Sequence, residues 1–287
     1  MKENNWFDPF YIQSHLSEEE SNIQKNVSNF CNNELKTNVV ERNRKNEFDK
    51  DLYPKFGSLG VLGQTVKTHG GSGTSNLAYG LVAYEFEKID SSYRSSISVQ
   101  SSLVINPINE FGSQEQKDKY LPQLIKGEKI GCFGLTESEA GSDPTSMKTS
   151  FKKTKDGYII NGSKNWITNA PIADIFIIWA IEKNKDHKSI KGFIIEKNTE
   201  GLNTSTIENK TSLIISPTGQ IILNNVFVPN NLCLENTEGW KSVFSCLNKA
   251  RFGISWGVLG SASECWLIAK EYVENRIMFK KPLASNQ

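Results

Sequence analysis

The spacing of hydrophobic positions changes twice along the chain. From Ser17 to about Lys126, apolar residues recur every three to four positions, which is typical of amphipathic helices. Near Glu128 the period falls to two, as in strands, and after Gly239 the helical period returns and continues to Arg276. The sequence therefore predicts an N-terminal all-helical domain (1–128), a middle β domain (129–235) and the first long helix of a further helical domain (236–287).

Local signals indicate where individual helices begin. Ser17 is followed by Glu20 at the spacing of a capping box. The Gly70–Gly73 turn precedes Thr74 and Ser75, which open a further helix. A glycine-rich turn before a helix can bind phosphate. Because no strand of the dinucleotide-binding type precedes this turn, a tight corner is the favoured interpretation.

The middle region reads as a succession of short strands. An Asp156–Gly157 turn lies between the first two and is a strong hairpin signal. Several short strands in a row imply an antiparallel sandwich or barrel, and hence an α+β protein. The expected strands after the apolar run 130–133 are 148–154, 158–168, 175–181, 192–196, 204–207 and 220–228.

The last helix carries a continuous apolar stripe on one side. No proline interrupts it before Pro282, and Gly253, Gly257 and Gly260 suggest that another helix or a ligand approaches closely. A long one-sided helix needs a partner to cover its stripe, so poor solubility or dependence on a partner is expected. The stripe consists of Val243, Leu247, Ala250, Ile254, Val258, Ala262, Cys265, Ala269 and Tyr272.

Composition excludes several classes of function. The 287 residues include 33 basic and 32 acidic side chains, and a net charge of +1 gives no field that would attract nucleic acid or an anionic membrane. Five cysteines lie far apart without a CxxC pair, which argues against a disulfide framework and a zinc site. No metal site is expected, and no apolar run approaches the roughly 20 residues of a membrane helix.

The segment Phe133–Asp143, followed by Pro144, holds the most suggestive chemistry. It continues the apolar run at 130–133 and reads Phe-Gly-Leu-Thr-Glu-Ser-Glu-Ala-Gly-Ser-Asp. Gly134 and Gly141 have no side chains to hold a flat ligand away from the main chain. Thr136 and Ser142 offer hydroxyls that donate or accept hydrogen bonds. From these residues alone, a polar connection between two strands is the simpler alternative.

The order of helices, β domain and helices, with this loop at the first strand, resembles the acyl-CoA dehydrogenase family, and within it the glutaryl-CoA dehydrogenases. The similarity runs from Trp6 to Gln287. The best-matching segments are 90–103, 131–137, 164–169 and 247–260. The resemblance further implies that this chain lacks most of the family's C-terminal helical domain.

The resemblance implies FAD as cofactor. Trp166, Ile167 and Thr168 would pack against the isoalloxazine ring, whereas the pattern alone fits a core position for Trp166 equally well. Arg276 and Gln287 match contacts that the family makes across a subunit interface, which implies a homo-oligomer, in the family a homotetramer. In the first loop the implied FAD contacts are Phe133, Gly134, Leu135, Thr136, Gly141 and Ser142.

The resemblance also implies an acyl-CoA substrate, with glutaryl-CoA favoured. Arg94 would pair with the terminal carboxylate of a dicarboxylic acyl chain through two parallel hydrogen bonds. Without the family, Arg94 reads as a surface arginine with an acid seven residues earlier. Ser95 and Ser98 would complete the pocket and Glu87 would orient Arg94, while Ser142, Phe244, Leu247, Asn248 and Arg251 would line the path of CoA.

The implied reaction oxidises and decarboxylates glutaryl-CoA to crotonyl-CoA in lysine and tryptophan breakdown, and passes electrons to an electron-transferring flavoprotein. The family's catalytic glutamate would lie beyond Gln287, and its second known position falls on Ala250, so no catalytic base is assigned in this chain. Ile214 stands where the family usually has an arginine. Two alternatives stay open. The chain is a truncated, non-catalytic paralogue that keeps partial FAD or CoA binding or joins a full-length relative, or it is an enzyme for another short-chain acyl-CoA.

Relatives work in the mitochondrial matrix, which the resemblance implies here too. The N-terminus, Met1–Pro9, shows neither a secretory signal nor an arginine-rich presequence, so a cytoplasmic location stays open.

Overall fold

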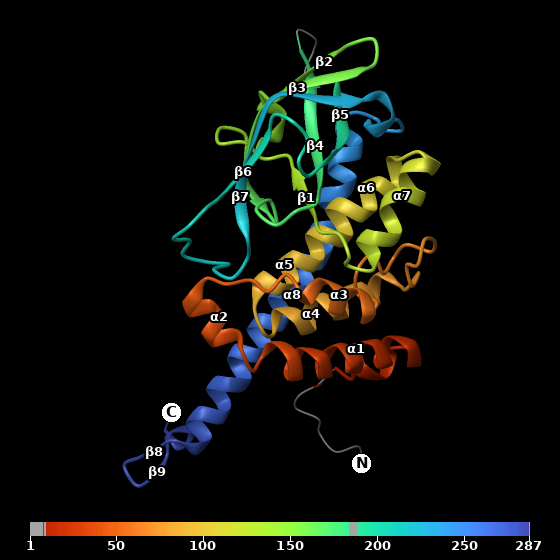
Figure 1. Ribbon diagram of the computed structural model, residues 1–287. Coiled ribbons are helices and arrows are strands. Elements are labelled where there is room, and N and C mark those ends of the chain that lie inside the picture. Colours follow the sequence, from red (N-terminus) through yellow and green to blue (C-terminus); the bar gives the residue numbers. More distant parts are fainter. Residues whose placement is uncertain (1–7, 9, 184–188, 287) are drawn as a thin grey trace.

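The computed structural model describes residues 8, 10–183 and 189–286. Helices gather at one end of the molecule and a curled sheet at the other, and the long C-terminal helix runs past both (Figure 1). Gln287 and most of the N-terminal segment that bears on localisation lie outside the described residues.

The N-terminal region is helical, as predicted. Ser17 caps the first helix, since its hydroxyl accepts a hydrogen bond from the Glu20 amide at 3.2 Å while Glu20 accepts from the Ser17 amide at 3.0 Å. Two stretches, Cys31–Leu35 and Val99–Ile105, widen into π-helix. The α-helices are α1 (Glu18–Phe30), α2 (Val39–Lys45), α3 (Leu52–Ser58), α4 (Asn76–Glu87), α5 (Ser91–Ser98), α6 (Asn106–Phe111) and α7 (Gln114–Ile125).

The glycine-rich turn before α4 is a tight corner. The Gly73 amide donates to the Val66 carbonyl at 2.9 Å, and a Cβ on Gly71 would lie 2.3 Å from the same oxygen. Ser75 then caps α4 by accepting from the Ala78 amide at 3.0 Å. These contacts account for the glycines without a phosphate.

Seven strands form one sheet in the order β1-β4-β2-β3-β7-β6, with β5 on the other edge of β4. Two pairings, β1 with β4 and β2 with β4, are parallel, so the expectation of purely antiparallel pairing was wrong for them. Alternation of apolar residues reports only which face is buried, not the direction of the neighbouring strand. The strands are β1 (Gly131–Gly134), β2 (Ser150–Lys153), β3 (Gly157–Thr168), β4 (Ile175–Glu182), β5 (Ile190–Glu196), β6 (Leu202–Thr206) and β7 (Thr218–Pro229).

Two hydrophobic cores hold these parts together. One joins the N-terminal helices to one face of the sheet and to the start of the long helix, with Phe133, Trp179 and Val243 at the junction. The other fills the inside of the curled sheet, where the rings of Phe151 and Phe193 lie 5.2 Å apart. The shared first core fixes the segment Phe133–Asp143, called the signature loop below, relative to the helices.

The long helix α8 (Trp240–Asn275) packs on α4 through its glycines. A Cβ on Gly253 would lie 2.5 Å from the Tyr79 hydroxyl, and one on Gly260 would lie 2.1 Å from the Tyr84 carbonyl oxygen. The close approach of another helix at these glycines is therefore confirmed. A two-stranded hairpin, β8 (Ile277–Met278) and β9 (Lys281–Pro282), follows α8.

The predicted apolar stripe is only partly covered. Val243 and Ala250 are buried, but Ile254, Val258 and Tyr272 are exposed. The buried face is rotated towards the glycines, because α4 can approach most closely where side chains are absent. Within the described part of the chain, no helix is both long and apolar enough to cross a bilayer.

Candidate active site

A buried glutamine fixes the strand that leads into the signature loop. The Gln100 amide donates to the carbonyls of Leu124 and Lys129, at 2.9 Å each, and accepts from the Gly131 amide at 2.8 Å. From the other side, the Asn169 amide donates to the Gly131 carbonyl at 3.1 Å. The first residue of β1 is therefore held by both the helical region and the sheet.

A buried ion pair then holds the loop itself. The Lys164 ammonium donates to the Leu135 carbonyl and to the Glu137 carboxylate, both at 2.9 Å. Burial lowers the pKa of Lys164 to about 8, against the opposing effect of Glu137. Burial would raise the pKa of Glu137, but the charge and hydrogen bond of Lys164, together with hydrogen bonds from Thr149 and Lys148, outweigh it, and the pKa of Glu137 is lowered. Sequence reasoning missed this pair, because an alternating strand gives no sign that a lysine faces inward.

Trp166 stands out on the surface beside this loop. Its backbone has φ 60°, in a register shift between Lys164 and Ile167, and its side chain is 58% exposed. The neighbouring Asn165 amide donates to the Thr136 carbonyl at 2.9 Å, which brings the two predicted cofactor segments together. Positive φ in a bulky residue is uncommon and costly. The core interpretation of Trp166 is excluded, and a flat ring is presented at the loop.

Several of the predicted cofactor residues have side chains that face inward. Phe133, Leu135 and Ile167 are buried in the two cores. A ligand could reach these three residues only through their main chain. Thr168 is half-buried.

The two loop glycines serve different purposes. A Cβ on Gly134 would lie 2.5 Å from the Cδ1 atom of Ile178, so this glycine also leaves room for packing inside the sheet. At Gly141 a Cβ would meet no atom within 4 Å, and Ser142 is exposed. The open part of the loop is therefore its second half.

Arg94 is buried rather than on a helix surface. Its Nε donates to Glu87, whose other oxygen accepts from the Ser91 hydroxyl at 2.9 Å. Gly257 of α8 packs directly over the pair, since a Cβ there would lie 2.0 Å from Glu87 and 3.1 Å from Arg94. The two terminal guanidinium nitrogens make no hydrogen bond to the described residues, so they stay available to a planar acceptor.

The serines predicted beside Arg94 differ in their surroundings. Ser98 is buried and bonds to the Tyr79 hydroxyl at 3.2 Å, and Tyr79 also bonds to Ser102 at 2.9 Å. Ser95 is half-buried. Tyr79 was not predicted, because nothing in the helical pattern separates it from other apolar-face residues.

Four of the five predicted CoA-path residues lie in the first third of α8, whereas Ser142 lies in the signature loop. Phe244 is partly exposed with its ring 5.8 Å from that of Trp240, and Leu247 packs on the core. Arg251 is exposed and donates to Asn248 at 2.7 Å. Ala250 faces the core and offers no proton acceptor.

Of the two predicted cofactor residues nearest the C-terminus, Arg276 is not brought to the signature loop within one chain. Arg276 directly follows α8, and Figure 1 shows the C-terminal end of α8 far from the sheet. Gln287 lies outside the described residues. The proposed contact of Arg276 across a subunit interface stays a prediction.

The loop around Ile214 is closed without an arginine. The Lys210 ammonium donates to the Leu213 carbonyl at 2.6 Å and to the Thr218 hydroxyl at 3.1 Å. Ile214 is half-buried. Lys210 thus holds this loop together.

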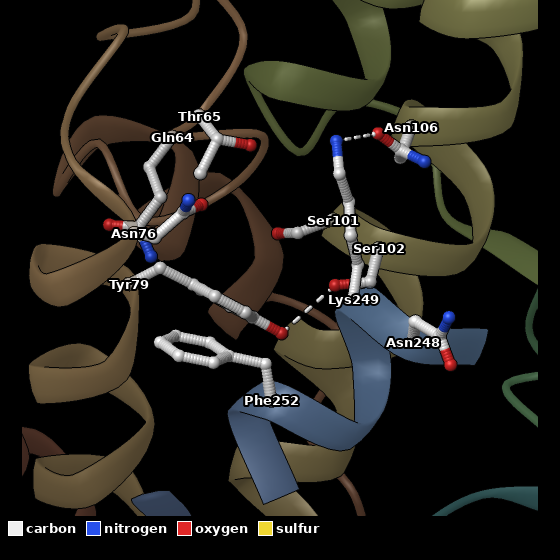
Figure 2. Close-up of a pocket in the computed structure, with 10 residues that line it drawn as sticks. All are labelled: Gln64, Thr65, Asn76, Tyr79, Ser101, Ser102, Asn106, Asn248, Lys249 and Phe252. Atoms are coloured by element: carbon white, nitrogen blue, oxygen red, sulfur yellow. Dashed lines mark hydrogen bonds between the residues drawn. The ribbon is translucent and has the colours of Figure 1, made fainter. Parts of the chain in front are cut away.

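A cavity of about 290 Å³ opens between the N-terminal helices and α8 (Figure 2). Of the residues that line it, the sequence had singled out Asn248 alone. The remaining lining residues come from segments distant in the chain, among them Gln64, Asn76, Tyr79, Ser101, Asn106 and Lys249.

Comparison with known proteins identifies the family. Three models of the acyl-CoA dehydrogenases match: the N-terminal domain over residues 17–128, the middle domain over 132–226 and the C-terminal domain over 237–287. An acyl-CoA dehydrogenase of Bacillus subtilis is 35% identical over 276 residues, which cover 95% of this chain and 73% of that protein. The chain belongs to the acyl-CoA dehydrogenase family.

Solved structures of these oxidoreductases share the fold. A glutaryl-CoA dehydrogenase of Mycobacterium smegmatis, solved with FADH2, is 39% identical, has a TM-score of 0.94, and is matched over 97% of this chain and 71% of its own. Butyryl-CoA dehydrogenase of Megasphaera elsdenii is 34% identical with a TM-score of 0.89, over 95% of this chain and 73% of its own. The predicted family and fold class are thus confirmed.

Proposed function

We propose that this acyl-CoA dehydrogenase acts on a short-chain acyl-CoA thioester with FAD, and that glutaryl-CoA is its favoured substrate. The observation that carries the substrate proposal is the buried Arg94–Glu87 pair, in which Arg94 uses only its Nε and its terminal nitrogens bond to none of the described residues. An arginine buried against an apolar acyl chain would be costly without an anionic partner, and a second carboxylate gives it one.

The residues around the signature loop fit a flavin. Trp166 offers an exposed flat ring, the Thr136 main chain lies next to it, and Gly141 leaves open space in which a cofactor can approach. Thr168 and Ser142 would supply hydroxyls. When bound, FAD supplies the acceptor for the hydride that leaves the β-carbon. The relative from Mycobacterium smegmatis was solved with FADH2, which supports this cofactor.

This chain's own residues would orient the substrate. Arg94 would hold the terminal carboxylate, Ser95 and Ser98 would donate to it, and Glu87 would keep the guanidinium plane in place. Phe244, Leu247, Asn248 and Arg251 would line the path of CoA along α8. With alanine at position 250, we assign no base within this chain, and a chain that binds FAD or CoA without turnover remains the alternative.

A different short-chain acyl-CoA is the second candidate, because a relative in Megasphaera elsdenii, 36% identical, is short-chain specific. The proposal has three further parts. Electrons pass to an electron-transferring flavoprotein, the chain forms a homo-oligomer with Arg276 at its interface, and the protein resides in mitochondria or in the cytoplasm.

Replacing Arg94 separates the two substrates. The variant Arg94→Gln should weaken binding of glutaryl-CoA about 10- to 100-fold, because two charge-assisted hydrogen bonds are lost, and leave butyryl-CoA binding nearly unchanged. Calorimetric titration of both thioesters measures this. Glu87→Gln/Arg94→Gln serves as the folding control, since it leaves no buried charge unpaired. Equal losses for both thioesters would refute the role of Arg94.

Turnover is tested separately by an anaerobic titration of the flavin-loaded chain with glutaryl-CoA. Bleaching of the oxidised flavin band is the result expected of an active enzyme. A bound flavin that stays yellow would favour the non-catalytic alternative.

A further inference from the structure

We propose that the cavity between α4, the π-helical segment Val99–Ile105 and α8 is a second binding site, for a small organic carboxylate with a flat apolar body. The inference goes beyond the proposed function, because the cavity uses neither the signature loop nor Arg94 and shares only Asn248 with the proposed path of CoA.

Two opposite walls of the cavity differ in polarity. On one side, the rings of Tyr79 and Phe252 stack with centroids 6.2 Å apart and an interplanar angle of 24°. Across from this floor, Gln64, Thr65 and Ser101 present an amide and two hydroxyls (Figure 2). A thin ligand with an apolar body and a polar edge matches these two sides.

Gln64 supplies an unused donor. The side chain is 2% exposed and lines the cavity, yet its amide nitrogen has no hydrogen-bond partner among the described residues. A buried donor without a partner costs stability, and few occur in folded proteins. An acceptor on a bound ligand would satisfy it.

Lys249 determines the charge of the ligand. It is the one charged side chain among the described residues that line the cavity, and it donates to the Asn106 carbonyl oxygen across the opening (Figure 2). Lys249 also forms an ion pair with Glu110 at 3.8 Å, but both side chains are about half exposed there and Glu110 does not line the cavity. A single cation balances a carboxylate, whereas a phosphate dianion would need more positive charge to leave water.

Tyr79 separates this cavity from the Arg94 pair. Its ring forms part of the cavity floor, and its hydroxyl bonds to Ser98 on the Arg94 side. The lining of the cavity includes Tyr79 but not Arg94, so the cavity and the Arg94 pair are distinct.

The test uses benzoate as probe and benzamide as its neutral match, with binding to the 287-residue chain followed by saturation-transfer NMR and calorimetry. Benzoate should bind saturably, and Lys249→Gln should weaken it about tenfold without changing benzamide binding. Lys241→Gln removes an exposed, ion-paired lysine of the same helix and should change neither.

Gln64→Leu adds a readout that a purely structural role would not give. It should weaken benzoate binding roughly fivefold while raising the melting temperature of the empty protein, because the unpartnered donor is gone. A Glu87→Gln/Arg94→Gln variant should bind benzoate as the wild type does, even if glutaryl-CoA binding is lost. Absence of saturable benzoate binding, equal effects of the two lysine variants, or loss of benzoate in the Arg94 variant would overturn the proposal.

Discussion

At the scale of single residues, the signature loop depends on a lysine whose charge is costly to bury. Lys164 is fully buried and has two oxygen partners, Leu135 and Glu137. One carboxylate and one carbonyl do not fully replace water around an ammonium, which is why its pKa falls although Glu137 opposes the fall. Trp166, two residues after Lys164 on the same strand β3, has a positive φ.

The lowered pKa of Lys164 predicts a rise of stability with pH. The folded protein releases this proton near pH 8 and the unfolded chain near 10.5, so between these values the unfolded state binds more protons. The unfolding free energy of the wild type should therefore rise, relative to Lys164→Met, by up to about 3 kcal/mol across that window. Urea unfolding of both proteins at several pH values measures the difference, and a constant difference would contradict the prediction.

The sequence could predict residue roles where a motif dictates them, but not where the surroundings do. Ser17 and Ser75 cap helices as their local patterns required. Lys164 and Trp166 lie on one strand, and the register shift between them turns the lysine inward and the tryptophan outward. Such a shift depends on the pairing with β7, which a single strand's sequence does not contain.

At the scale of elements, local periodicity was sufficient for the position of strands and insufficient for their direction. The predicted strands 158–168 and 175–181 agree with β3 and β4 within one residue. The parallel pairing of β1 with β4 depends on how the chain enters the sheet from the helical region, over distances that periodicity does not report. The cavity was unpredictable for the same reason, since Gln64, Asn106 and Lys249 meet only in the folded chain.

The glycine face of α8 predicts a mutation whose effect opposes helix propensity. In Gly260→Ala the new methyl would lie 2.1 Å from the Tyr84 carbonyl oxygen, so α8 must move away from α4. Overpacking of this kind costs about 1–3 kcal/mol, more than the roughly 1 kcal/mol that alanine gains over glycine in a helix. Ser255→Ala, on the exposed side of α8, should be nearly neutral. A stabilised Gly260→Ala in chemical denaturation would show that the two helices do not pack so closely.

At the scale of the whole molecule, one face of α8 leaves apolar side chains in water. Ile254, Val258 and Tyr272 share one side of the helix and are each more than two-fifths exposed, with the exposed Phe279 in the hairpin that follows the helix. Contiguous apolar surface of this kind favours association. We therefore expect the chain to self-associate as its concentration rises, with α8 at the contact.

Charges on that face should reverse the association. Val258→Lys and Tyr272→Lys together should lower the sedimentation coefficient at high concentration to that of a monomer, because a charge buried in an apolar contact is costly. Lys36→Gln, which removes an exposed lysine paired with Glu264 at the side of α8, is the matched surface control. Circular dichroism checks that the helix persists in each variant. A wild-type chain that stays monomeric at every concentration would show that this apolar face alone does not drive assembly.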